Sequence, residues 1–159
     1  MIVFAIDSGL ERTGFSVFRN ESKPEYLDSG LITTPSKYSI SRRLELIYDA
    51  LATQCKKHTP DVMVIEQLFF FKNQKTVIPV AQAQGVAQLL AAQRQIPVEF
   101  LTPLQIKQIV TGYGQSDKES VNKMIRLTLP SISLDKKIDD EIDAIACGLA
   151  YCYQNKKLL

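Results

Sequence analysis

The sequence predicts an α/β protein in which helices flank a mixed β-sheet. One observation is the order of the predicted elements, which runs β-β-β-α-β-α-β-α-α-α along the chain. The other is that short apolar runs bounded by turn residues alternate with segments whose apolar residues recur every three or four positions. The 159 residues contain no internal repeat, low-complexity tract or long linker, so we predict one domain over residues 1–159.

The first three predicted strands form an antiparallel meander. Residues 2–6 are a continuous apolar run that stops at Asp7 and a Ser-Gly turn, which is typical of a strand buried on both faces. Residues 13–18 and 27–33 have strand character, and turn-forming residues separate them. The short connections favour antiparallel pairing.

The rest of the chain alternates between helices and strands. A helix with one buried face is predicted over residues 40–55, with Ser39 or Ser41 as its N-cap. Residues 61–67 (DVMVIEQ) repeat the pattern of the first strand, because a short apolar run ends on a carboxylate, Glu66. The remaining predicted elements are a helix over about 76–94, a strand at 98–101, helices near 103–110 and 118–129, and a last helix that begins near Asp139.

The composition is that of an ordinary globular protein, with 45% hydrophobic and 23% charged residues. No uncharged run reaches the roughly 18 residues of a membrane span, so we expect a soluble, cytoplasmic protein without a membrane partner. The three cysteines, Cys55, Cys147 and Cys152, lack C-x-x-C spacing, and His58 is the single histidine. Buried reduced thiols are therefore favoured over a zinc site.

Two predicted strands end on a carboxylate, and a right-handed crossover places both ends at one edge of the sheet. These carboxylates are Asp7 and Glu66, and ligands bind at this edge in open α/β sheets. Asp140 and Asp143 lie three residues apart in the first turn of the last helix, so they face the same way. Clustered carboxylates suit a hard ion such as Mg²⁺. Two ions about 4 Å apart activate water and stabilise the leaving oxygen in phosphodiester cleavage.

Each acid also has an ordinary structural explanation. Asp7 could begin a turn, Glu66 could form a surface ion pair, and residues 139–143 could cap a helix. The occurrence of all three features in one chain favours the metal site. The formal net charge of +2 does not itself indicate a polyanion partner. Setting four of the 17 acids aside against the 19 basic residues leaves +6 on the remaining surface, enough to attract phosphate.

Two further segments suit nucleic acid. Residues 69–75 (FFFKNQK) follow the strand of Glu66 and place aromatic rings, Lys72 and Lys75 beside the predicted metals. An aromatic ring stacked on an exposed base is worth about 1–3 kcal/mol. Two of the three phenylalanines could instead complete the core or a dimer interface. Residues 111–120 (TGYGQSDKES) place glycines before a helix N-terminus, which suits a phosphate or simply forms a loop capped by Ser116 or Asp117.

Four segments resemble the successive motifs of the RuvC Holliday-junction resolvases, members of the ribonuclease H-like superfamily. They are AIDSGLERTGFSV, VIEQLFFFKN, AQAQGVA and DDEIDAIACGLA, and the resemblance covers nearly the whole chain in register. It implies a ribonuclease H-like fold with a mixed five-stranded sheet. It also implies a homodimeric, Mg²⁺-dependent crossover junction endodeoxyribonuclease that acts in recombination and DNA repair. Such enzymes nick opposite strands of a four-way junction symmetrically and leave ligatable ends.

The resemblance also assigns residues and partners. Phe69 matches an aromatic near the junction crossover, whereas Lys107 and Lys118 match basic residues near the scissile phosphate and backbone. Lys118 is expected to stabilise charge that develops on the phosphate. Two Mg²⁺ ions per active site are implied, with Mn²⁺ as a substitute, and the RuvA–RuvB branch-migration complex is the implied protein partner. The implied metal-binding acids are Asp7, Glu66, Asp140 and Asp143.

The chain departs from the family pattern at three places. Ser8 stands where a proline is usual, and Gln84 stands where many members have arginine. Glu141 and Ile142 separate the last two acids, where small residues are common. Glu141 could therefore compete as a ligand, and Asp139 could substitute for Asp140.

Two other functions stay open at this point. One is a ribonuclease H-like nuclease that acts on RNA, related to the YqgF group. The other is a structure-specific DNA-binding protein whose metal site is catalytically defective.

In addition, the small residues of the helix over 76–94 allow close helix packing, either within the chain or across a two-fold interface.

Overall fold

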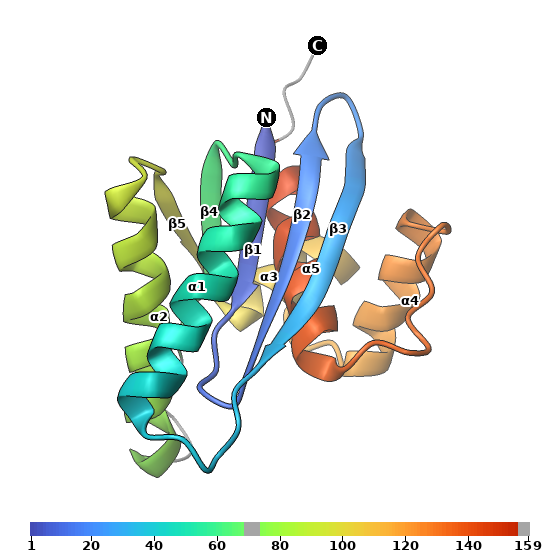
Figure 1. The fold of residues 1–159 in the computed structure, drawn as a ribbon. Helices are drawn as coiled ribbons and strands as arrows, with labels where there is room; N and C mark the ends of the chain where they lie inside the picture. Colours follow the sequence, from blue (N-terminus) through green and yellow to red (C-terminus); the bar gives the residue numbers. More distant parts are fainter. Residues whose placement is uncertain (69–73, 156–159) are drawn as a thin grey trace.

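The computed structural model describes residues 1–68 and 74–155. A five-stranded sheet in the order β3-β2-β1-β4-β5 forms its central layer (Figure 1). The strands are β1 (Ile2–Asp7), β2 (Arg12–Asn20), β3 (Pro24–Thr33), β4 (Val62–Glu66) and β5 (Val98–Leu101). The helices are α1 (Ile40–His58), α2 (Gln74–Gln93), α3 (Pro103–Thr111), α4 (Lys118–Thr128) and α5 (Asp139–Gln154). The predicted fold class and order of elements are confirmed.

The central strand, β1, pairs antiparallel with β2 and parallel with β4. Because Ile6 lies opposite Ile65 in the parallel pair, the residues that follow them, Asp7 and Glu66, leave the sheet at the same end. β5 continues the parallel part, and β3 continues the antiparallel part. The mixed sheet thus brings the two acid-ended strands side by side.

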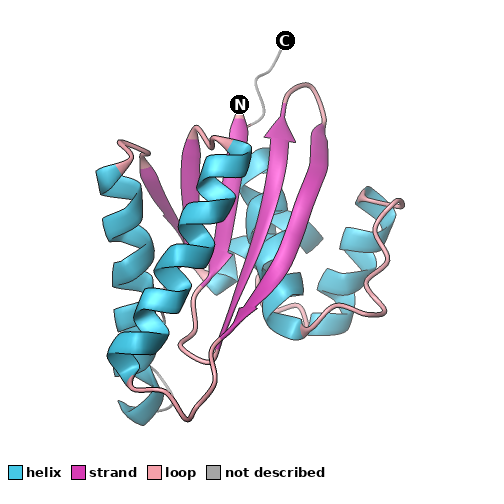
Figure 2. Cartoon of the chain, viewed as in Figure 1, coloured by secondary structure: helices cyan, strands magenta, loops and turns pink. Residues whose placement is uncertain are grey.

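Helices cover both faces of the sheet, as Figure 2 shows. On one face, Phe4 and Ile6 of β1 belong to the core that α1 and α2 cover. On the other face, Val3 and Ala5 belong to a second core with α3, α4 and α5. Successive side chains of a strand point to opposite faces, so a strand between two helical layers must be apolar throughout. This requirement explains the unbroken apolar run that begins the sequence.

The hairpin of β2 and β3 is longer than the sequence predicts. β2 runs to Asn20 and β3 starts at Pro24, where a broader turn is expected. Arg19 and Glu25 lie opposite each other in the register, and Arg19 Nη1 is 2.6 Å from Glu25 Oε2. Polar residues that look like a loop in the sequence therefore form a solvent-exposed end of the sheet.

Helix starts follow the predicted capping residues where alternatives were open. Ser39 caps α1, because its side chain accepts a hydrogen bond from the backbone N–H of Arg42. Asp117 caps α4 through the backbone N–H of Ser120.

Cys55, Cys147 and Cys152 are free and buried, as predicted. Within residues 1–68 and 74–155, no helix combines the length and apolar character needed to cross a membrane.

Candidate active site

Two half-buried carboxylates mark the edge where β1 and β4 end. Burial, together with the negative charges of Asp143 and Asp140, raises the pKa of Asp7 to about 7 against the opposing effect of Lys118. Burial likewise raises the pKa of Glu66 to about 8, with Asp7 and Asp143 contributing in the same direction. The two groups share an environment that disfavours negative charge unless a cation offsets it.

The first turn of α5 brings two more carboxylates to this edge. Asp140 and Asp143 lie on this helix, and Asp143 lines the same pocket as Glu66. Burial raises the pKa of Asp143, whereas the ammonium of Lys118 lowers it. We call Asp7, Glu66, Asp140 and Asp143 the acid cluster, because each either shifts the pKa of another member or has its own pKa shifted by one.

α5 approaches the sheet closely because small residues line its path. A Cβ atom on Gly14 of β2 would lie 1.9 Å from the backbone oxygen of Asp140, so only glycine fits there. Ser16 is fully buried, and its hydroxyl donates a 2.7 Å hydrogen bond to the backbone oxygen of Ala144. Further along, a Cβ on Gly148 would lie 2.7 Å from the ring of Phe18. Since Gly14 pairs with Asp7 in the sheet, this contact sets the position of Asp140 relative to Asp7.

Two cationic side chains pair with acids of α5. Lys118 Nζ, at the start of α4, lies 3.1 Å from Asp139 Oδ2 and 3.3 Å from Asp143 Oδ2. Burial alone would lower the pKa of Lys118, but the two carboxylates raise it above its ordinary value. Arg12 Nε lies 3.1 Å from Asp140 Oδ2. The acids are therefore balanced in part by cations of the chain itself.

The acid cluster has the chemistry of a divalent-metal site. Its donors are carboxylate oxygens alone, which are the ligands that hard cations prefer. Asp140 Oδ2 is buried and makes no hydrogen bond, although it has the charge of Arg12 nearby. In their present conformations, no three His, Cys, Asp or Glu side chains of the described part of the chain converge closely enough to hold an ion. Ion pairs with Arg12 and Lys118 hold Asp140 and Asp143, and a bound cation would offset the mutual repulsion of the acids.

A pocket of about 200 Å³ opens beside the acid cluster. Lys107 of α3, with Lys118 and Asn122 of α4, joins Glu66 and Asp143 in its lining. The remaining walls are apolar and come from α3, α4 and α5. The two lysines predicted to act near a phosphate thus share one cavity with two of the four acids.

Two of the three departures from the family pattern, Ser8 and Gln84, lie at this edge. Gln84 of α2 is buried, and its Nε2 donates a 3.3 Å hydrogen bond to the backbone oxygen of Glu66. Ser8 is buried directly after Asp7, and its hydroxyl has no hydrogen-bond partner within the described residues. Gln84 therefore supports the end of β4 from the opposite face of the sheet.

Three predicted DNA-binding residues fall outside what the structure describes. Phe69 and Lys72 lie in residues 69–73. Lys75 lies in the first turn of α2, but its side chain is not among those described. Their roles stay predictions.

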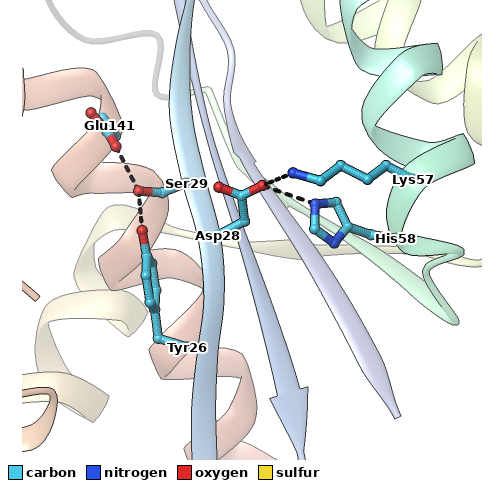
Figure 3. A network of polar contacts seen from close by, with 6 residues as sticks. All are labelled: Tyr26, Asp28, Ser29, Lys57, His58 and Glu141. Atoms are coloured by element: carbon cyan, nitrogen blue, oxygen red, sulfur yellow. Dashed lines mark hydrogen bonds and ion pairs between the residues drawn. The ribbon is translucent and has the colours of Figure 1, made fainter. Parts of the chain in front are cut away.

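Glu141 is held away from the acid cluster by a polar network on the adjoining face of β3 (Figure 3). Its Oε1 accepts hydrogen bonds from Ser29 Oγ at 2.5 Å and from Lys137 Nζ at 2.6 Å. Ser29 Oγ in turn lies 2.7 Å from the hydroxyl of Tyr26. Figure 3 also shows Asp28 on the other side of β3, bound to Lys57 and His58. Glu141 thus anchors the start of α5 to β3, and we expect this network to keep it from competing with Asp140 for the acid cluster.

We expect Glu141→Gln to weaken folding and to leave cleavage intact. The substitution leaves Lys137 with a neutral partner in a mostly buried position, so the free energy of unfolding should fall by about 1–2 kcal/mol. Urea denaturation and a junction-cleavage assay measure the two effects. Loss of cleavage in a folded Glu141→Gln protein would instead make Glu141 a metal ligand.

The raised pKa values predict an unusual dependence of stability on pH. A carboxyl group whose pKa is higher in the folded state stabilises folding below its unfolded pKa and loses that effect as pH rises through the folded value. For Asp7 the values are 3.8 and about 7, and for Glu66 they are 4.5 and about 8. In EDTA, the thermal midpoint should therefore decrease between about pH 4 and pH 8. A divalent cation should flatten this decrease, and a profile identical with and without cation would contradict it.

Sequence reasoning identified the acids and missed much of their support. It passed over Arg12, Gly14 and Ser16, although all three lie in the first motif. The Thr-Gly-Phe-Ser segment has a sequence signal for this role, because glycine and serine inside a predicted strand leave room for close approach of another backbone. Asn122 gave no such signal, since a lone polar residue on a helix is usually solvated.

Comparisons with known proteins agree with this geometry. The family model described as "Crossover junction endodeoxyribonuclease RuvC" matches residues 3–152. A protein of that name from Clostridioides difficile is 43% identical over 157 residues, which cover 98% of this chain and 92% of the relative. One from Dictyoglomus thermophilum is 40% identical over 157 residues, covering 98% and 99%. The solved structure of Thermus thermophilus RuvC in complex with Holliday junction substrate superposes with a TM-score of 0.90 at 24% identity, covering 98% of this chain and 95% of that one.

The sheet order, with acids at the ends of β1 and β4 and on α5, defines a nuclease of the ribonuclease H-like class. Nucleases of this kind depend on divalent metal ions. The chain belongs to the RuvC family of crossover junction endodeoxyribonucleases. The fold, the enzyme class and the family predicted from the sequence motifs are confirmed.

Proposed function

We propose that this protein resolves four-way DNA junctions by symmetric paired nicks, using Mg²⁺ held by the acid cluster. The observation that carries the proposal is that four carboxylates from β1, β4 and α5 lie at one edge of the sheet, beside a pocket that two lysines line. Nearby acids that raise one another's pKa need a cation, and nearby lysines suit a phosphate. A phosphodiester substrate that binds together with divalent cations satisfies both requirements.

Each acid has a role that follows from its position. Asp7 lies at the centre of the cluster, because Asp140 and Asp143 raise its pKa and its own charge raises the pKa of Glu66. Asp7 would therefore anchor the ions. Glu66 and Asp143 complete their coordination from the pocket side. Asp140 would hold the ion that supplies the attacking water. When bound, two Mg²⁺ ions would lower the pKa of that water and stabilise the leaving oxygen, and Mn²⁺ would serve in their place.

The lysines act on the substrate. Lys118 lies within ion-pair distance of Asp143 and shares the pocket with Lys107. A fixed cation at this place stabilises negative charge that develops on the phosphate in the transition state. Lys107 holds the neighbouring backbone, whereas Phe69, Lys72 and Lys75 contact DNA close to the junction centre.

The proposal includes a homodimer, because a symmetric four-way junction needs two cuts. The outward face of α2 supports it: Ile78 and Leu89 are 66% and 55% exposed, and Ala81 and Gly85 lie between them on the same stripe. Light scattering after gel filtration tests the dimer, and a monomer at micromolar concentration without DNA would count against it.

We place the enzyme in the cytoplasm as one nuclease domain over residues 1–159, with the RuvA–RuvB complex as partner.

The decisive experiment offers three substrates to the wild-type protein and to Glu66→Gln. The substrates are a four-way junction with a mobile core, a linear duplex of matching sequence and an RNA–DNA hybrid, each with Mg²⁺ or EDTA. We expect paired symmetric nicks in the junction alone, lost with EDTA and in the variant.

Other outcomes would select the alternatives. Cleavage of the hybrid would point to an RNA-directed relative such as the YqgF group. Tight junction binding with no cleavage in Mg²⁺ or Mn²⁺ would indicate a DNA-binding protein with a defective metal site.

A further inference from the structure

A second groove, of about 330 Å³, borders the acid cluster at a different place from the lysine pocket. Four elements and a loop form its walls: residues 9–11 between β1 and β2, Arg12 at the start of β2, Arg43 of α1, Pro79 and Val80 of α2, and Asp140 of α5. In Figure 1 this place is the lower end of the sheet, where α1 and α2 both begin. We call it the arginine groove, because Arg12 and Arg43 supply its two cations.

The guanidinium of Arg43 is held in the groove through its Nε, and its terminal amino groups remain available as hydrogen-bond donors. Its Nε donates a 2.8 Å hydrogen bond to Thr34 Oγ1, and the Thr34 hydroxyl donates to the backbone oxygen of Leu10. Thr34 is 1% exposed, so this link between α1 and the loop after β1 is rigid. Within the described residues, the Nε bond is the one hydrogen bond that the side chain of Arg43 makes. Both terminal amino groups of a held guanidinium are then free for a bidentate ligand.

Arg12 connects the groove to the acid cluster. Its side chain is 51% exposed, and its Nε lies 3.1 Å from Asp140 Oδ2. Asp140 also raises the pKa of Asp7, so the groove and the acids share this residue. A DNA strand whose phosphate lies over the acid cluster therefore has cations on both sides, lysines in one pocket and arginines in the other.

We propose that the arginine groove binds a backbone phosphate of the cleaved DNA strand next to the scissile one, through Arg12 and Arg43. The inference rests on the proposed function and adds a phosphate subsite to it. Guanidinium groups match phosphate oxygens in a planar, bidentate geometry that lysine cannot provide. Leu10, Pro79 and Val80 give the groove an apolar wall for a sugar.

The negative charges of the groove make this subsite dependent on Asp140. Glu11 and Asp140 both line the groove, so their formal charges cancel those of Arg12 and Arg43. Arg12 is paired with Asp140. Neutralising Asp140 releases Arg12 to the phosphate. Asp140→Asn should therefore tighten junction binding, and this gain should disappear when Arg12→Gln is added.

Fluorescence anisotropy of a labelled four-way junction in EDTA tests the groove without cleavage. Arg43→Gln, and Arg12→Gln in the Asp140→Asn background, should each bind about tenfold more weakly than their parent proteins. The slope of log affinity against log salt should become shallower by about one for each arginine removed. Arg43→Lys should recover the slope without recovering all of the affinity.

Arg42→Gln is the matched control, because Arg42 is the exposed neighbour of Arg43 and pairs with Glu45. It should keep the affinity and salt slope of the parent. Unchanged binding and slopes in the Arg12 and Arg43 variants, while the parent proteins bind the junction, would overturn the groove and leave the proposed function intact. If Arg43→Gln lowers the thermal midpoint, its weaker binding could come from misfolding. The Arg12→Gln variant in the Asp140→Asn background then decides the test, because Arg12 is exposed. A wild-type protein that binds no junction would overturn the proposed function together with the groove.

Discussion

Asp7→Asn should abolish junction cleavage while the protein still binds the junction. Asp7 is the acid whose pKa responds to both carboxylates of α5, so its loss removes the central anchor for cations. Metal-assisted stabilisation of a phosphodiester transition state is worth several kcal/mol, so the cleavage rate should fall at least about a thousandfold. Single-turnover cleavage in Mg²⁺ and anisotropy in EDTA measure the two properties on one preparation.

The same variant should be more stable than the wild type without metal. The pKa of Asp7 is about 7 in the folded protein, against an ordinary 3.8, so its charge opposes folding at pH 8. A neutral asparagine removes this cost, and the free energy of unfolding should rise by about 2 kcal/mol. This gain separates Asp7→Asn from a variant that is inactive because it is misfolded.

Asp135→Asn is the control for this experiment. Asp135 is 73% exposed and pairs with Arg126 at 2.8 Å rather than with a member of the acid cluster. It should keep both the rate of cleavage and the stability of the wild type. Metal-dependent turnover in Asp7→Asn would contradict the proposed mechanism, whatever the control shows.

Gly14→Ala should cost both stability and activity, although it adds a single methyl group. The new Cβ would lie 1.9 Å from the backbone oxygen and 2.4 Å from the backbone carbon of Asp140. Backbone atoms cannot rotate away, so α5 must move off β2, and the free energy of unfolding should fall by about 3 kcal/mol or more. A shift of Asp140 by about 1 Å should lower the rate of cleavage roughly a hundredfold.

Ser16→Ala tests the same contact without a clash. Ser16 lies on the same strand and donates to Ala144 of the same helix. Removing this hydrogen bond should cost about 1 kcal/mol and leave cleavage largely intact. If Gly14→Ala and Ser16→Ala prove equally mild in denaturation and cleavage assays, the close approach of α5 does not position the acids.

The arrangement of strands and helices could be predicted because local patterns carry it. An apolar run such as residues 2–6, bounded by turn residues, is typical of a strand covered on both faces, and the spacing of Ile47 and Leu51 indicates a helix with one buried side. The hairpin between Asn20 and Pro24 was predicted less well, since its polar residues pair across strands and solvent covers them. Such pairing leaves no hydrophobic period for a sequence pattern to reveal.

The candidate site, like the fold, could be predicted from the sequence only in part. Asp7, Glu66, Asp140 and Asp143 could be picked out because each occupies a strand end or the first turn of a helix, where topology fixes its direction. Glu141 could not be separated from Asp140 by sequence, because adjacent helical residues differ only in direction around the axis. The structure separates them through Ser29 and Lys137, which hold Glu141 on the side of β3.

By itself, the sequence determined the fold class, the order of the elements, the family and the acids. These depend on neighbouring residues and on short repeating intervals along the chain. Only the tertiary structure decided which cations face those acids, that Gly14 sets the approach of α5, and that Arg12 and Arg43 share a groove. Arg12, Arg43 and Asp140 come from three separate segments, and their encounter depends on how the packed helices cross the sheet rather than on local sequence.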